Sequence, residues 1–424
     1  MGLKTILAAV TVVAAAVQAQ PPGPALRVPL PFDLVDILDG VRFKIRVPRN
    51  WNGKLLVYLQ GTKTAPVPEP AVVPRVLPGS QPDLEETLLS RGYALAASDF
   101  GNMDMQVKEA VEDSLALTSY FRGLVGDPTR VILWGTTLGG LAALKMIEDY
   151  PRVFDAAIAT CPWAAGVPRV MDRQLDFGLA YAVAFGWPAD RWGPLEQLRP
   201  DLNLQTDVLS VAQVPKEDGS NRGAWEFIRL VRGIPSEAFW GTNPVYNAPG
   251  WRINLVIGIW ARAVNEGFAA GPITQNLDHR YTLKPEEKTY LAGLGVNADE
   301  LLAKMNARRN IMAAPHARDY VERFGTLRGL LRRPVLTLHN PTDNVVEVAN
   351  ESVYRAQVEG WGCQDRLLQV YVNNVGHNVQ TSAQLLATLE AMESWLDTGK
   401  RPDASFFPED KGFDNKFVPP PWPH

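Results

Sequence analysis

The spacing of hydrophobic and polar positions in the first part of the chain changes repeatedly between strand and helix patterns. Alternating runs at 34–38 and 41–47 flank Asp39-Gly40, which predicts a β-hairpin, and the apolar run at 54–59 predicts a buried strand. Further helices are expected at 82–91, 105–125 and 138–150, and further strands at 93–98, 131–134 and 154–161. Such alternation favours a parallel sheet with helices on both faces.

This alternation of strand and helix patterns ends at about Pro162 and resumes after about Leu331. The intervening pattern is mostly helical and holds seven of the twelve tryptophans. Strands are expected again at 334–338 and 367–372, and helices at 350–360 and 381–398. The sequence therefore predicts an α/β core in two parts, with a cap between them and a tail behind them. The expected bounds are 20–161 and 332–400 for the core, 162–331 for the mainly helical cap and 401–424 for the C-terminal tail.

The first residues follow the pattern of a secretory signal peptide. Lys4 precedes an apolar or small run at 5–17, and Val17-Gln18-Ala19 places small residues at the cleavage positions. We expect a signal peptide at 1–19, cleaved after Ala19, and a secreted protein. The apolar run is too short to span a bilayer, so no stable membrane anchor is expected.

Composition narrows the range of partners. With 46% hydrophobic and 21% charged residues, the chain of 424 residues has ordinary globular usage. Its net charge of -4 provides no basic surface for nucleic acid. The two cysteines, Cys161 and Cys363, leave both a disulfide and two free thiols open. Asn350-Glu351-Ser352 is a glycosylation sequon, which makes Asn350 a candidate glycan site in a secreted glycoprotein.

The stretch with the clearest chemistry runs from the predicted strand at 131–134 into Gly135-Thr136-Thr137-Leu138-Gly139-Gly140 and then into a helix. Its glycine spacing matches neither the dinucleotide-binding nor the phosphate-loop pattern. It resembles the nucleophile elbow of α/β-hydrolases, which normally reads Gly-x-Ser-x-Gly, with Thr137 in place of serine. The resemblance implies an α/β-hydrolase fold, a mostly parallel sheet flanked by helices with a large helical cap inserted after strand 6.

The resemblance also implies an acid and a histidine later in the chain, in that order. Asp343 lies in the loop at 339–346 after a predicted strand, and His377 lies in the loop at 373–378 after the next one, preceded by glycine. We therefore expect Thr137, Asp343 and His377 to form a catalytic triad. His339 is a rival for the histidine, but no glycine precedes it.

The same resemblance places an oxyanion hole at two backbone N–H groups, those of Leu138 and Thr62. The loop that contains Thr62 begins with Gln60-Gly61, whereas the family often has His-Gly there. Thr137 keeps a hydroxyl that a histidine can deprotonate, but its additional methyl stiffens the side chain and crowds the attacking oxygen. We expect slower acyl transfer than a serine would give.

The function that the resemblance implies is a serine-esterase-like hydrolase acting on an ester, lactone or amide of a small hydrophobic substrate. The chain has no metal-ligand spacing and no nucleotide loop, so no metal or cofactor is expected. Two alternatives stay open. One is a non-hydrolytic cyclase, lyase or condensing enzyme of secondary metabolism that uses His377 as a base, and the other is a catalytically inactive binding protein.

The aromatic residues of the cap also allow two interpretations. Ordinary packing of a helical cap is favoured, and an aromatic-lined pocket for a bulky substrate is the alternative. Phe177, Tyr181 and Phe185 follow one another at intervals of four and so share one helical face, which fits either role.

Overall fold

The structure, a computed structural model, describes residues 26–62, 69–77, 79–80, 83–100, 105–277 and 279–423. The expected signal peptide at 1–19 lies outside these residues. The main sheet of the described chain has the strand order β1-β2-β4-β3-β5-β6-β9-β10. Its strands are β1 (Phe32–Leu38), β2 (Val41–Val47), β3 (Lys54–Leu59), β4 (Ala94–Ser98), β5 (Arg130–Thr136), β6 (Ala156–Thr160), β9 (Val335–His339) and β10 (Leu367–Tyr371). β2 pairs antiparallel with β1 and with β4, and the other pairs are parallel.

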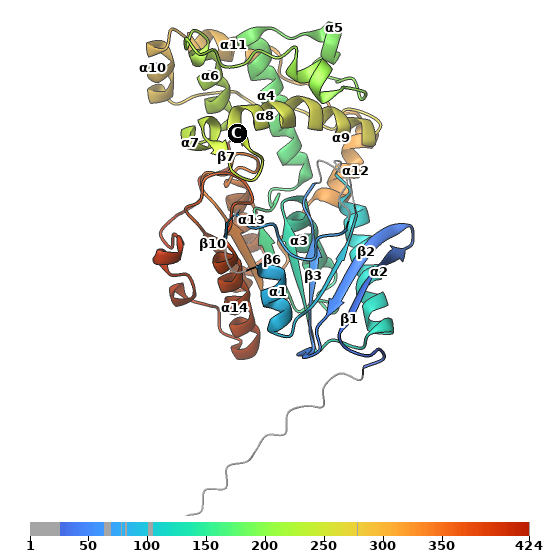
Figure 1. The fold of residues 1–424 in the computed structure, drawn as a ribbon. Coiled ribbons are helices and arrows are strands. Elements are labelled where there is room, and N and C mark those ends of the chain that lie inside the picture. The colour runs from blue at the N-terminus through green and yellow to red at the C-terminus, as the bar shows by residue number, and fades with distance from the viewer. Residues whose placement is uncertain are drawn as a thin grey trace, which may run out of the picture.

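Helices cover both faces of this sheet, as Figure 1 shows. α2 (Val107–Leu124), α3 (Leu138–Asp149) and α13 (Asn350–Gly360) share an apolar core with one face. α1 (Leu84–Ser90) and α14 (Ser382–Thr398) share a core with the other. In β3, Leu55 and Val57 belong to the first core and Leu56 and Tyr58 to the second. Because successive side chains of a strand point to opposite faces, a strand covered on both faces reads as a continuous apolar run.

The hairpin and the strand that leads to the elbow follow the local sequence. Asp39 and Gly40 both have positive φ, at 51° and 85°, which is the conformation of a tight hairpin turn with the right twist. β5 extends beyond the expected 131–134 and reaches Thr136, because its ladder with β6 continues through Gly135.

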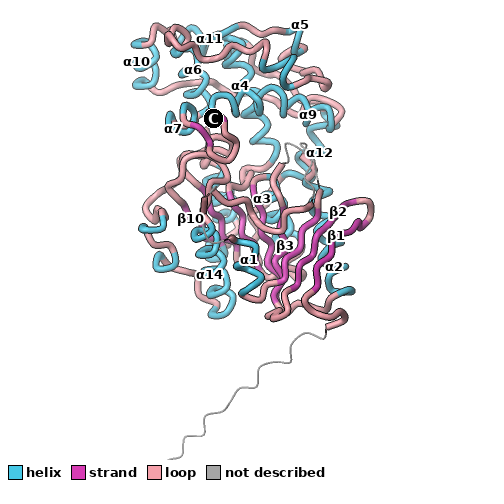
Figure 2. Tube along the Cα trace, in the orientation of Figure 1, coloured by secondary structure: helices cyan, strands magenta, loops and turns pink. Residues whose placement is uncertain are grey.

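The chain between β6 and β9 forms a mainly helical layer over one end of the sheet, visible above the magenta strands in Figure 2. Its elements are α4 (Val167–Phe185), α5 (Ala189–Trp192), η1 (Leu204–Leu209), α6 (Arg222–Arg232), α7 (Ser236–Trp240), β7 (Thr242–Asn243), β8 (Ala248–Pro249), α8 (Gly250–Leu255), η2 (Val256–Ala261), α9 (Arg262–Phe268), α10 (Pro285–Gly293), α11 (Ala298–Ala307) and α12 (Pro315–Gly325). Most of them surround an apolar core of their own, in which Trp192 and Trp225 are fully buried around Tyr181. We call this layer the cap.

Both ends of the cap segment also contribute to the sheet domain. Val167 and Met171 from the start of α4 belong to the same core as α2 and α3, and so do Ala317 and Val321 from α12. The border between the two cores therefore lies inside the segment 162–331. This shared packing fixes the first turns of α4 against the sheet.

The C-terminal residues connect the two layers. Phe407 and Phe413 pack on the face of the sheet covered by α14, and Phe413 forms a β-bridge with Val372. Pro423 then lies beside Gly233 in the cap, where Figure 1 marks the end of the chain. Within the described residues, no helix has the length and apolar character needed to cross a membrane.

The structure decides the state of the two cysteines and the accessibility of the glycosylation sequon. Cys161 and Cys363 are both free thiols. The glycan expected on Asn350 is a wrong prediction, because Asn350 is only 1% exposed. Its Oδ1 accepts a hydrogen bond from the Ala165 N–H (2.9 Å), and its Nδ2 donates to the Glu347 carbonyl (2.8 Å). A buried amide with both ends engaged has no room for a sugar.

Candidate active site

Thr137 sits on a strained turn between β5 and α3. Its φ of 58° and ψ of -116° are unusual for a residue with a branched side chain. The glycines of the turn are required by close packing. A Cβ on Gly135 would lie 2.1 Å from the Gly139 carbonyl oxygen, and a Cβ on Gly139 would lie 2.1 Å from that of Leu59. The helix therefore begins directly against the end of β3.

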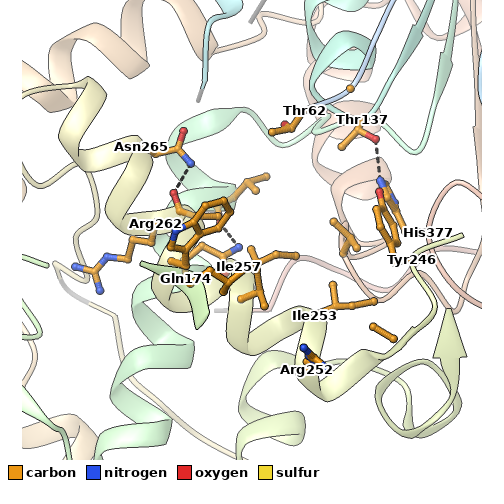
Figure 3. Close-up of a pocket in the computed structure, with 18 of the residues that line it drawn as sticks. Thr62, Thr137, Gln174, Tyr246, Arg252, Ile253, Ile257, Arg262, Asn265 and His377 are labelled. Atoms are coloured by element: carbon orange, nitrogen blue, oxygen red, sulfur yellow. Dashed lines mark hydrogen bonds between the residues drawn. The ribbon is translucent and has the colours of Figure 1, made fainter. Parts of the chain in front are cut away.

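Thr137, His377 and Asp343 are brought together at this turn. The Thr137 hydroxyl lies 2.7 Å from His377 Nε2, and His377 Nδ1 lies 2.6 Å from Asp343 Oδ2 (Figure 3 shows the first contact). An ionised carboxylate can only accept, so the proton of the ring is on Nδ1 and Nε2 accepts from the hydroxyl. This is the arrangement of a nucleophile, a general base and an orienting acid.

Asp343 is a buried but ionised carboxylate. Its Oδ1 accepts the backbone N–H groups of Val345 (2.8 Å) and Val346 (2.9 Å). Burial alone would raise the pKa of Asp343, but the charges and hydrogen bonds of His377 and His339 outweigh burial and lower it well below its usual range. The acid therefore keeps its charge throughout the neutral range.

The rival His339 lies behind Asp343, where it is fully buried. It does not line the cavity that contains Thr137 and His377. His339 Nε2 is 3.5 Å from Asp343 Oδ2, and Nδ1 is 3.1 Å from Glu351 Oε1. Its position excludes it as the base that meets the substrate.

The two residues expected to form the oxyanion hole flank Thr137. Leu138 is the first residue of α3, where backbone N–H groups have no acceptor within the helix. On the other side, a Cβ on Gly61 would lie 3.1 Å from Thr137 Cβ and 3.2 Å from its Oγ1. Thr62 follows Gly61 and lines the same cavity. Gln60 donates to Asp99 Oδ1 (3.2 Å) and to the Phe100 carbonyl (3.0 Å), which anchors this loop where the family often has histidine.

A cavity of about 390 Å³ extends from Thr137 and His377 into the cap. Its walls are mainly apolar, from α4, η1, α8 and η2, and Trp163 and Trp260 line it. Phe177, Tyr181 and Phe185 do not line the cavity but pack against one another, with ring centroids 6.3 and 5.2 Å apart. The cap aromatics thus divide between core packing and the wall of the cavity.

Strand order and site together decide the fold. A mostly parallel sheet carries the strained turn after β5, the acid after β9 and the histidine after β10. This combination is specific to one fold. The chain has the α/β-hydrolase fold.

Comparisons with known proteins found similar sequences but no matching family. No protein-family model matches the chain. The chain is 25% identical over 420 residues to an o-phthalyl amidase from Xanthobacter agilis, across 87% of this chain and 88% of that protein. A shorter match, 33% identical over 96 residues, is to the quorum-quenching protein AidA from Acinetobacter baumannii and covers 20% of this chain and 31% of that protein.

Solved structures similar to this chain include two proteins from Aspergillus oryzae. One is an esterase, with 15% identity and a TM-score of 0.41, and the other is feruloyl esterase B, with 14% identity and a TM-score of 0.43. Each match covers 87% of this chain and 80% of the other. These scores are low, so the fold assignment rests on strand order and the elbow. The site geometry and the similarity to an amidase support a hydrolase of this fold.

Two residues of the site were not predicted from the sequence. Asn378, with a positive φ of 55°, places its Nδ2 at 3.2 Å from Thr137 Oγ1. Tyr246 of the cap stacks on the His377 ring, with centroids 6.3 Å apart and an interplanar angle of 10°. Asn378 could have been noticed because it follows His377 directly. Tyr246 is distant in sequence from every motif and gave no signal.

The cap also holds the loops that carry the acid and the histidine. Asn243 Nδ2 donates to the His377 carbonyl (3.3 Å) and to Asn344 Oδ1 (3.3 Å), and Asn254 Nδ2 donates to the Asn344 carbonyl (2.8 Å). Gly376, with a φ of 110°, is needed here because a Cβ would lie 2.8 Å from Asn243 Nδ2. The glycine before His377 therefore makes room for a cap side chain.

Cys161, at the end of β6, lies close to the acid and the base. Ligand atoms of Cys161, Asp343 and His377 are all within 4.8 Å of one another. Burial, with the nearby charge of Asp343, raises the pKa of the Cys161 thiol well above its usual range. Because the thiol is neutral and His377 and Asp343 are bonded to each other, the cluster fits a triad with a packed neighbour better than a metal site.

Proposed function

We propose that this chain is a secreted hydrolase that cleaves an amide or ester bond of an aromatic or otherwise hydrophobic small molecule through an acyl-enzyme on Thr137. The observation that carries this proposal is the chain of contacts Thr137–His377–Asp343, at 2.7 and 2.6 Å, at the end of an apolar cavity. Export rests on the signal-peptide pattern at 1–19. It predicts a mature N-terminus at Gln20, which sequencing of the exported protein would test.

The geometry supports an acyl-transfer mechanism. His377 Nε2 takes the proton of the Thr137 hydroxyl as Oγ1 attacks the substrate carbonyl carbon. The negative charge on the carbonyl oxygen is stabilised by the N–H groups of Leu138 and Thr62. His377 then gives its proton to the departing amine or alcohol, and the acyl group stays on Thr137. Water, deprotonated by His377, releases the acid and restores the hydroxyl.

Two observations narrow the substrate. The relative is named as an amidase for o-phthalyl groups, which are aromatic acyl groups, and Trp163, Trp260 and Tyr246 line the cavity of this chain. Arg252 also lines the cavity and is exposed, and its side chain has no hydrogen-bond or ion-pair partner among the described residues. Arg262, the other lining arginine, is already paired with Glu266 at 2.8 Å. A substrate with an aromatic acyl group and a carboxylate would fit this combination.

Thr137 is the residue that decides between hydrolysis and its alternatives. The test measures hydrolysis of carboxybenzoyl 4-nitroanilides and activated aryl esters, together with labelling by a fluorophosphonate. We expect labelling at Thr137, loss of at least about a thousandfold in kcat/KM in Thr137→Ala and His377→Ala, and faster ester hydrolysis in Thr137→Ser. The exposed His316 provides the matched control, His316→Ala, which should leave the rate unchanged.

Other outcomes point to the other functions. Activity that survives Thr137→Ala but not His377→Ala would show base catalysis without an acyl-enzyme. No turnover and no labelling in the wild type would favour a binding protein.

The substrate class is tested at Arg252. Arg252→Gln should lower kcat/KM for carboxylated anilides about tenfold relative to uncharged anilides, since a charge-assisted hydrogen bond contributes about 1.5–3 kcal/mol. Arg169→Gln, an exposed α4 arginine outside the cavity, is the matched control.

A further inference from the structure

The triad is connected to a second buried charged group that the proposed mechanism does not use. His339 and Glu351 are both fully buried, and Glu351 comes from α13 on the side of His339 away from Asp343. The side chains form a continuous series in the order Thr137, His377, Asp343, His339 and Glu351. Two carboxylates and two imidazoles thus share one interior site.

Hydrogen-bond acceptors surround both ring nitrogens of His339. Nδ1 faces Glu351 Oε1 at 3.1 Å, and Nε2 faces the Val346 carbonyl oxygen at 3.0 Å and Asp343 Oδ2 at 3.5 Å. A neutral imidazole has one N–H and one acceptor nitrogen, so it would leave a nitrogen lone pair against an oxygen. With Glu351 as a carboxylate, these contacts favour protons on both nitrogens. In agreement, Asp343 and Glu351 outweigh burial and raise the pKa of His339 to about 9.

Glu351 has further hydrogen-bond partners on the side away from His339. Its Oε2 accepts hydrogen bonds from the Thr337 hydroxyl (2.7 Å) and from Gln369 Nε2 (2.6 Å), and its Oε1 faces His339. With His339 protonated, the three groups Asp343, His339 and Glu351 carry a net charge of -1. Without that proton they would carry -2 in a buried site, which would pull a proton onto His377 and remove its capacity as a base.

The remaining titratable groups nearby do not replace this charge. Tyr371 is the β10 partner of His339, and burial raises its pKa far above the working range. Cys161 of β6 is a neutral thiol for the same reason. Arg355 of α13 bonds to Gln369 Oε1 (2.7 Å) and to the Tyr371 hydroxyl (3.3 Å). His339 is thus the cation that directly contacts the buried carboxylates.

We propose that His339, held as an imidazolium between Asp343 and Glu351, is a positioning residue that fixes Asp343 and offsets its charge, so that His377 Nε2 remains able to accept the proton of Thr137. This inference rests on the proposed function for its activity readout. His339 acts through Asp343 and never contacts the substrate. Glu351 faces Nδ1 of His339, and Asp343 also stabilises the positive charge of the ring.

The test uses two charge-removing variants that should move the acidic limb of the kcat/KM profile in opposite directions. His339→Gln removes a positive charge, so the midpoint of the limb should rise by about one pH unit. In Glu351→Gln, Asp343 still stabilises the imidazolium of His339, so the net change is the loss of one negative charge and the midpoint should fall. A purely structural role predicts a lower plateau with unchanged midpoints. The surface variant His316→Gln is the control and should leave the profile in place.

A second readout separates this inference from the proposed function. Nitrogen-15 NMR of the imidazoles in the intact wild-type protein should show two N–H groups on His339 at pH 7 and a His377 midpoint that shifts in both variants as the profile does. This measurement needs no substrate. The count of N–H groups on His339 is made on the wild-type protein, so it does not depend on whether the variants fold. One N–H on His339, or midpoints of His377 that do not move, would overturn the inference even if hydrolysis is confirmed. Two N–H groups with shifted midpoints would support it even if no substrate is turned over.

Discussion

A methyl group at Gly139 is the sharpest test of how the nucleophile turn is packed. In Gly139→Ala the new Cβ would lie 2.1 Å from the Leu59 carbonyl oxygen and 2.3 Å from that of Gln60. Ordinary contact distances are larger by about 1 Å or more. Both neighbours are backbone atoms that cannot rotate away, so the start of α3 and the end of β3 must separate.

The size of the effect follows from this geometry. Overpacking a well-ordered interior costs about 1–3 kcal/mol, and a clash between two backbone segments belongs at the upper end, at about 3 kcal/mol. The same movement separates Gly61 from Thr137, whose side chain would be only 3.1 Å from a Cβ on Gly61. A displacement of about 1 Å at a reacting centre lowers rates about a hundredfold. Stability and activity should therefore fall together.

Urea unfolding measures the loss of stability in Gly139→Ala, and ester hydrolysis measures the loss of activity of the same protein. Gly123→Ala is the matched control, because nothing lies within 4 Å of a Cβ at that position of α2. It should stabilise the protein by about 0.5–1 kcal/mol, since alanine replaces glycine within a helix. If Gly139→Ala unfolds at the same urea concentration as the wild type and keeps its kcat/KM, the close packing of the elbow against β3 is refuted.

Three further changes test other parts of the site and fold. Asn378→Ala removes the 3.2 Å contact to Thr137 and should lower kcat/KM about five- to tenfold in steady-state assays, with little change in urea unfolding; an unchanged rate would contradict that contact. Asn243→Ala removes the amide that holds the acid and histidine loops and should lower both kcat and the unfolding free energy, the latter by about 1–3 kcal/mol; a loss in KM alone would argue against this role. Asp113 has its pKa raised to about 6, first by burial and then by Glu109 and Glu112, so it weakens the fold as pH rises from about 4 through 6. Asp113→Asn should therefore raise the unfolding free energy by about 1 kcal/mol at pH 7, after allowance for solvent screening, and change nothing at pH 3; equal effects at both values would exclude titration as the cause.

Local sequence signals predicted the scaffold well where one short segment decides the structure. The buried strand expected at 54–59 and the helix expected at 350–360 have those bounds in the structure. The elbow could be predicted because its glycines are needed at fixed spacing from Thr137, and the order of acid and histidine follows from the fold. Asn350 shows the limit of such signals. A sequon is a local pattern, whereas burial against Ala165 depends on how β6 and α13 meet.

Residues that act on the site from a distance in sequence had no comparable signal. Tyr246, Asn243 and Arg252 all come from the short cap segment between α7 and η2, a region without periodic alternation. Their importance arises only when the cap closes over the sheet and brings Tyr246 onto the His377 ring and Asn243 onto the His377 carbonyl. His339 is similar, since its charge depends on Glu351 from a separate helix. The sequence thus predicts which groups meet at the elbow, and the packing of cap and core determines which side chains hold His377 and line the cavity.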